Sequence, residues 1–105
     1  MLAVCTTVGT REDARRLARV CVEQKLAACV QLSEIESFYE WNGALQHEGE
    51  VRLVCKTTED RYPALEAALL AAHPYALPAV FALKIEHANP AYGHWVNAQT
   101  ASGCR

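Results

Sequence analysis

The sequence predicts an α+β fold, a ferredoxin-like antiparallel βαββαβ sheet followed by a C-terminal helix. Two observations support this prediction. Apolar, β-branched runs alternate with amphipathic runs in the order strand, helix, strand, strand, helix, strand. The connecting helices are short and lead directly into strands, which places both on one face of the sheet. The 105 residues of the chain leave room for one domain, over residues 1–105.

The first part of the chain predicts a strand followed by a helix. Residues 2–8 form an apolar, β-branched run that Gly9 ends, which is typical of a strand. Residues 10–26 follow as an amphipathic helix, in which Thr10 and Asp13 have the spacing of a capping box. Its apolar stripe recurs at the helical period, at Ala14, Leu17, Ala18 and Cys21.

Residues 27–57 predict two strands joined by a loop. The run 27–41 is longer than a typical strand and alternates imperfectly, which indicates a bent or bulged strand. Turn-forming residues occupy 42–49 and predict a hairpin loop there. Residues 50–57 alternate as a strand, with one face made by Val51, Leu53 and Cys55.

A second helix is expected to follow, with its cap near Thr58 or Asp60. Pro63 is tolerated only in the first turn of a helix, which favours the later start. The helix is expected to end at His73, because Pro74 disfavours the helical conformation for the residue before it.

The rest of the chain predicts a last strand over residues 79–86 and a short final helix. Asn89 is a good N-cap and Pro90 suits the first helical position, so this helix should run from there to residue 99. With both long helices on one face, the other face of the sheet needs a cover. A subunit contact is the economical one, since an exposed apolar sheet face is a liability.

Composition excludes several classes of protein. The net charge of −2 provides no electrostatic reason to expect nucleic acid or an anionic membrane as a partner. No apolar run approaches the roughly 20 residues of a membrane span, and the N-terminal residues do not resemble a secretory signal. We therefore expect a cytoplasmic protein. Phosphate-binding glycine loops and hydrolase motifs are absent from the sequence, so we do not expect an enzyme.

The cysteines do not indicate a disulfide framework. There are five, an odd number, and no two of them form a C-x-x-C pair. Cys5, Cys29 and Cys55 lie in predicted strands, where a free cysteine is most often a small buried apolar residue. Cys104 lies in the tail and is expected to be mobile and open to oxidation.

Five short motifs, in order and spacing, resemble one family over nearly the whole chain: "KLAACV" (25–30), "YEWNG" (39–43), "EVRLVCKTT" (50–58), "HPYALP" (73–78) and "NPAYGHW" (89–95). They are similar to those of the CutA divalent-cation-tolerance proteins. The resemblance implies a ferredoxin-like protomer in a homotrimer like that of the PII signalling proteins. It also implies tolerance to divalent metals, copper above all, with no firmly assigned catalytic activity.

The resemblance further implies two metal ligands, Cys5 on the first strand and His73 at the corner after the second helix. A thiolate and an imidazole suit copper or zinc far better than magnesium or calcium. This chain has Ala72 where some relatives carry a second histidine, and Ala79 where many carry an acidic residue. A closed metal site would then need donors from neighbouring chains or water.

In the family the same corner borders a cleft between subunits, which His73 and Tyr75 would face. Lys56 could reach an anionic ligand there. Each of these residues also has a plain structural interpretation. Cys5 fits a core position, His73 suits a helix C-terminus, Tyr75 can pack its ring, and Lys56 can be solvated or ion-paired.

Three functions stay open at this point. The first is a trimeric protein that binds copper or another divalent ion, such as zinc, and takes part in the response to metal ions. The second is a PII-like module that binds a small ligand in the cleft between subunits. The third is a structural trimer whose partner protein matters more than its pocket.

Overall fold

A computed structural model describes residues 1–101, and its elements follow the predicted order. Cys104 lies outside these described residues. The elements are β1 (Leu2–Val8), α1 (Arg11–Glu23), β2 (Cys29–Trp41), β3 (Ala44–Thr57), α2 (Tyr62–Ala72), β4 (Val80–Lys84) and α3 (Pro90–Gln99).

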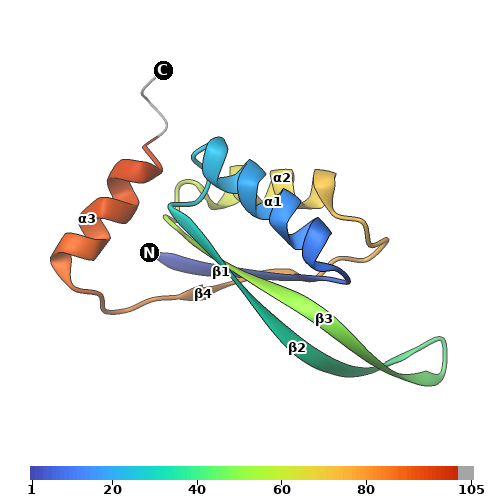
Figure 1. Ribbon diagram of the computed structural model, residues 1–105. Coiled ribbons are helices and arrows are strands. Elements are labelled where there is room, and N and C mark those ends of the chain that lie inside the picture. Colours follow the sequence, from blue (N-terminus) through green and yellow to red (C-terminus); the bar gives the residue numbers. More distant parts are fainter. Residues whose placement is uncertain (102–105) are drawn as a thin grey trace.

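The four strands form one antiparallel sheet in the order β2-β3-β1-β4. Helices α1 and α2 lie side by side on one face of this sheet, while α3 stands at the end opposite the β2–β3 turn (Figure 1). This arrangement confirms the predicted α+β, ferredoxin-like fold with a C-terminal helix.

The core fills the space between α1, α2 and the sheet. Alternate residues of the central strands point into it, as the period of two in a strand requires. Val4 and Val8 of β1 and Leu53 of β3 are buried against helical residues such as Leu17, Leu65 and Leu69. The apolar face predicted for residues 50–57 is therefore the face that packs under the helices.

The β2–β3 hairpin is longer than the sequence predicts. Its two strands pair without interruption from Cys29 opposite Lys56 to Trp41 opposite Ala44. The predicted loop over residues 42–49 is wrong, because Asn42 and Gly43 alone make the turn. Both have positive φ, of 54° and 79°, as a type I′ hairpin turn requires.

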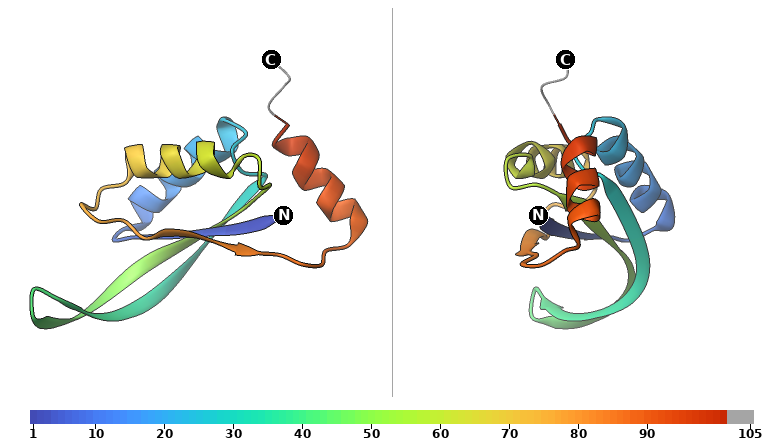
Figure 2. Two further views of the ribbon diagram at one scale, coloured as in Figure 1. Left: turned by 180° about the vertical axis from the view of Figure 1, so that it is seen from behind. Right: turned by 90° about the vertical axis from the view of Figure 1, so that its left-hand side faces the viewer.

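Beyond the end of β1 this hairpin continues as a two-stranded ribbon that projects from the sheet and curls (Figure 2). The sequence predicted a strand that is either bent or bulged. The unbroken register shows that β2 bends and has no bulge. The polar residues of 44–49 looked like a loop because the ribbon is largely exposed and needs few apolar side chains.

Gly43 should be the sensitive glycine of this hairpin. Gly43→Ala is expected to lower the free energy of unfolding by about 1 kcal/mol, because a Cβ is unfavourable at its φ of +79°. Gly49→Ala is the matched control, since a Cβ meets no atom within 4 Å at either glycine and only Gly43 has a positive φ. Denaturant unfolding of both variants tests this, and equal losses would contradict it.

Helix α1 begins at the predicted cap and ends earlier than predicted. Thr10 caps α1 as predicted, accepting a hydrogen bond of 3.1 Å from the Asp13 amide. The helix ends at Glu23, before the predicted residue 26, and Lys25 then adopts a positive φ of 59°. Leu26 donates its amide back to the Cys21 carbonyl, which closes the end of the helix.

The start of α2 differs from the prediction, and its end agrees. Neither Thr58 nor Asp60 is the cap, because a backbone turn leads into the helix and its N-cap is Arg61, without a side-chain hydrogen bond. Pro63 does lie in the first turn. At the other end His73 is the C-cap, with an extended ψ of 136°, as expected before a proline.

The sheet face turned away from α1 and α2 is only partly covered. It carries exposed Phe81 and Leu83 from β4, a strand that is shorter than the predicted 79–86.

The short final helix predicted from Asn89 is present as α3, with the Asn89 side chain accepting a hydrogen bond from the Tyr92 amide. Within residues 1–101 no helix is long and apolar enough to cross a membrane.

Candidate functional site

His73 holds the corner between α2 and the segment that leads to β4. Its Nδ1 accepts a hydrogen bond of 3.2 Å from the Tyr75 amide. Its Nε2 lies 3.0 Å from the Thr7 carbonyl oxygen and 3.1 Å from Thr6 Oγ1, both at the end of β1. Since Nδ1 is an acceptor, the neutral ring carries its proton on Nε2 and donates it to the Thr7 carbonyl. Both ring nitrogens are therefore engaged.

Burial lowers the pKa of His73, although the hydrogen bond to Thr7 opposes this effect. A lowered pKa favours the neutral imidazole, which is the form that the hydrogen bonds at the corner require. The His73 side chain thus links the segment after α2 to the end of β1. A metal ion would have to displace one of these partners to reach a ring nitrogen.

Tyr75 connects the same corner to the projecting ribbon. Its ring lies 5.0 Å from the His73 ring, and its hydroxyl donates a hydrogen bond of 2.7 Å to Glu50 Oε2. The other carboxylate oxygen of Glu50 accepts a bond of 2.6 Å from Ser37. Glu50 is only 9% exposed, and these two hydroxyl donors compensate for its burial.

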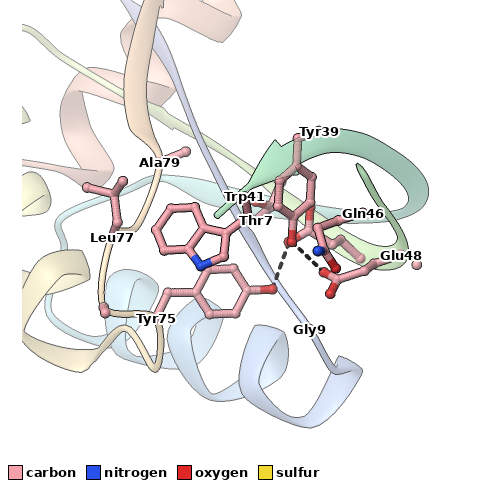
Figure 3. A pocket seen from close by; sticks show the side chains of 12 residues that line it. Thr7, Gly9, Tyr39, Trp41, Gln46, Glu48, Tyr75, Leu77 and Ala79 are labelled. Carbon is pink, nitrogen blue, oxygen red and sulfur yellow. Dashed lines mark hydrogen bonds between the residues drawn. The ribbon is translucent and has the colours of Figure 1, made fainter. Parts of the chain in front are cut away.

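A pocket of about 750 Å³ lies between the ribbon and the segment 75–79 (Figure 3). Tyr39 and Glu48 stand on the ribbon side, where the Tyr39 hydroxyl donates a hydrogen bond of 2.8 Å to Glu48. The residues that line the pocket come from β1, the two ribbon strands and this segment, and are Thr7, Gly9, Tyr39, Trp41, Gln46, Glu48, Gly49, Glu50, Tyr75, Ala76, Leu77 and Ala79.

The tyrosines of this pocket keep their protons at neutral pH. The hydrogen bond to Glu48 is the main cause that raises the pKa of Tyr39. Burial, followed by the hydrogen bond to Glu50, raises the pKa of Tyr75. Both phenols therefore stay neutral and donate hydrogen bonds to the carboxylates of Glu48 and Glu50.

Cys5 and His73 are not brought together within one chain. Thr6, which bonds His73, points to the helical side of β1, and the alternation of a strand turns its neighbour Cys5 to the opposite face. There Cys5 is buried, with Val54 and Phe81 as its partners in the sheet register. Two candidate ligands thus lie on two faces of one sheet.

Lys56 lies away from the pocket. It is on the open face, near the end of β3, and donates a hydrogen bond of 2.9 Å to Gln31 of β2. Of the two residues predicted to border a ligand cleft, Tyr75 lines this pocket and Lys56 does not, since none of the described lining residues is a lysine.

The other described cysteines are also held by neighbours. Cys29 contacts the Tyr92 hydroxyl at 3.6 Å. The contact with the Cys21 thiol, together with burial, raises the pKa of Cys55 in the core, which keeps that thiol protonated. In residues 1–101 no three histidine, cysteine, aspartate or glutamate side chains gather so that they could hold a metal ion. The donors of a single chain therefore do not fit a closed metal site.

Sequence reasoning missed the ribbon half of this pocket. Tyr39 and Trp41 share one face of β2, and Glu48 and Glu50 share the same face of β3. The Asn42–Gly43 pair, the strongest short signal for a tight hairpin, would have brought these four residues together. Assigning 42–49 to a loop hid this alignment.

Comparison with known proteins agrees with the motifs of the sequence. The family model described as CutA1 divalent ion tolerance protein matches residues 2–99. Protein CutA of Mus musculus is 41% identical over 101 residues, which are 95% of this chain and 57% of the mouse protein. The divalent-cation tolerance protein CutA of Thermus thermophilus is 38% identical over 98 residues, which cover 92% of this chain and 95% of that protein.

The fold is shared as well. The structure of the periplasmic divalent cation tolerance protein CutA from Archaeoglobus fulgidus superposes with a TM-score of 0.92 at 29% identity, over 95% of this chain and 99% of that one. The chain spans little more than half the length of the mouse relative, at 57%, and nearly all of the Thermus one, at 95%. With a matching family model over almost every residue, the chain belongs to the CutA1 divalent ion tolerance family.

Proposed function

We propose that this protein is a divalent-cation-tolerance protein that works as a homotrimer, binds copper or another divalent ion such as zinc, and has no enzymatic activity. The observation that carries the proposal is the family match over residues 2–99. The relative from Thermus thermophilus bears the divalent-cation tolerance name and is covered over 95% of its length.

Exposed apolar side chains support the homotrimer. Phe81 and Leu83 on the open sheet face are each more than half exposed. Within residues 1–101 the edge strands β2 and β4 also have one unpaired side each. Contacts between copies would cover both the apolar face and the open edges.

The metal proposal takes Cys5 and His73 as two separate candidates, since they lie on opposite faces of the sheet. Cys5 is the better one, because both nitrogens of His73 already have hydrogen-bond partners. One thiolate does not complete a coordination sphere, so the remaining donors are expected from neighbouring chains or water.

Titration with copper, and in parallel with redox-inert zinc, tests this proposal on freshly reduced protein in thiol-free buffer. We expect saturable binding at a fixed ratio per trimer, with the mass of three chains by light scattering. Cys5→Ser should weaken metal binding at least about tenfold. Substitutions of residues that only hydrogen-bond a metal ligand already cost that much affinity. Cys29→Ser, which alters a strand cysteine bonded to Tyr92, is the matched control.

His73→Ala separates the two candidate ligands in the same titration. A loss of binding in this variant alone would assign the metal to the corner and exclude Cys5. Binding that stays unchanged in both variants, or uptake that never saturates, would show that the proposed donors are wrong.

We also propose the cytoplasm as the compartment of this protein. The described cysteines Cys5, Cys21, Cys29 and Cys55 are all free thiols, which suits a reducing environment. The relative from Archaeoglobus fulgidus is described as periplasmic, so this proposal places the present chain in a different compartment from that protein.

A further inference from the structure

We propose that the pocket between the ribbon and the segment 75–79 binds an organic ammonium cation. The site is built by Tyr39, Trp41 and Tyr75 together with the carboxylates of Glu48 and Glu50. Neither Cys5 nor His73 is among the residues that line it, so this inference stands apart from the divalent-ion function proposed above.

The charge of the pocket selects the sign of the ligand. Glu48 and Glu50 are the charged residues that line the pocket. Within residues 1–101 no lysine, arginine or histidine lines it. Hydroxyl donors hold both carboxylates in position: Tyr39 bonds Glu48, while Tyr75 and Ser37 bond Glu50. An anionic ligand would meet two carboxylates with no cation to compensate them, whereas a cation would be attracted.

The aromatic rings select the chemistry of that cation. Trp41 is 50% exposed and Tyr39 is 40% exposed, and within residues 1–101 neither ring stacks on another ring. Figure 3 shows Tyr75 pointing its hydroxyl toward the Tyr39 and Glu48 side of the same hollow. A cation over such ring faces is attracted by their negative charge density, and quaternary ammonium groups are bound in this way.

Size and donor type disfavour a bare metal ion in this pocket. A volume of about 750 Å³ is in the usual range for organic ligands. The ring faces offer no lone pairs, and the carboxylates of Glu48 and Glu50 alone do not supply the six or more oxygen ligands that a hard divalent ion seeks. The raised pKa of Tyr39 and of Tyr75 keeps both phenols neutral, so phenolate ligands are not provided at neutral pH.

Calorimetric titration of the metal-free protein with choline tests the inference. The neutral comparison ligand is 3,3-dimethyl-1-butanol, which has the shape of choline but no charge. We expect saturable binding of choline at one site per chain. The neutral analogue should bind at least about tenfold more weakly, because it lacks both the cation–π and the carboxylate attraction.

Two variants locate the site. Trp41→Leu keeps an apolar side chain but removes the ring, and Glu48→Gln removes one charge; each should weaken choline binding about tenfold. Glu40→Gln is the matched control, since Glu40 lies on the same strand but on the opposite face of the ribbon and is exposed. Circular dichroism and light scattering confirm that each variant keeps its fold and assembly.

The outcomes are distinct. Equal affinity for choline and its neutral analogue, or choline binding that both variants leave unchanged, would overturn the inference. The lack of any saturable binding up to about 10 mM choline would overturn it as well, because a dissociation constant above that value corresponds to a binding free energy weaker than about 3 kcal/mol. Loss of divalent-ion binding in the separate copper titration would not affect this site, and loss of choline binding would not affect the metal proposal.

Discussion

Replacing Leu69 with alanine is expected to lower the free energy of unfolding by about 3 kcal/mol, because the lost methyl groups leave a cavity in the core. Leu69 lies on α2, is 0% exposed and packs in the cluster between the helices and the sheet. Buried residues of β1 and β3, such as Val4 and Leu53, belong to the same cluster.

Leu70→Ala is the matched control for this prediction. Leu70 is the next residue of the same helix but is 48% exposed, and its truncation should change the free energy of unfolding by less than about 0.5 kcal/mol. Denaturant unfolding at equal chain concentration measures both, since the stability of an oligomer depends on concentration. Similar losses in the two variants would show that α2 does not pack by the face described above.

Replacing His73 with alanine is expected to cost about 2 kcal/mol of stability, because the Tyr75 amide and the Thr7 carbonyl lose their partner. The corner that positions Tyr75 should loosen with it. His94→Ala is the control, since His94 is exposed on α3 and should behave like wild type. A His73→Ala variant as stable as the His94→Ala variant would mean that the corner holds without these hydrogen bonds.

The same histidine predicts a pH dependence with a definite sign. Burial lowers the pKa of His73 below its ordinary value of 6.5, so the unfolded chain binds a proton more readily than the folded one. The stabilisation is therefore fully present above pH 6.5 and decreases as the pH falls through the folded-state pKa. Unfolding curves between about pH 7.5 and 5 should show this loss, and His73→Ala should reduce it. An identical pH slope in the variant would contradict the assignment.

Local signals in the sequence were sufficient for most of the fold. Thr10 and Asp13 marked the start of α1, Pro74 stopped α2 at His73, and Asn89 with Pro90 started α3. Each works through one or two hydrogen bonds or a steric restriction within a few residues, so no distant contact was needed to predict it.

The candidate site was only half predictable. The corner motif pointed to His73 and Tyr75, but the partners of these residues come from β1 and β3, more than twenty residues away along the chain. Glu48 was missed because residues 44–49, which lack the apolar alternation by which strands are recognised, were assigned to a loop.

The order of the elements, the inward face of residues 50–57 and the family could all be predicted from the sequence. These follow from periodicity, capping and motif spacing, all of which are local. Three features of the site came from the folded chain alone: Cys5 and His73 lie on opposite faces of the sheet, Lys56 lies away from the pocket, and Ser37 and Tyr75 both bond Glu50. Strand pairing and chain reversal bring distant residues together, and a pairing register is a property of two segments that neither segment contains alone.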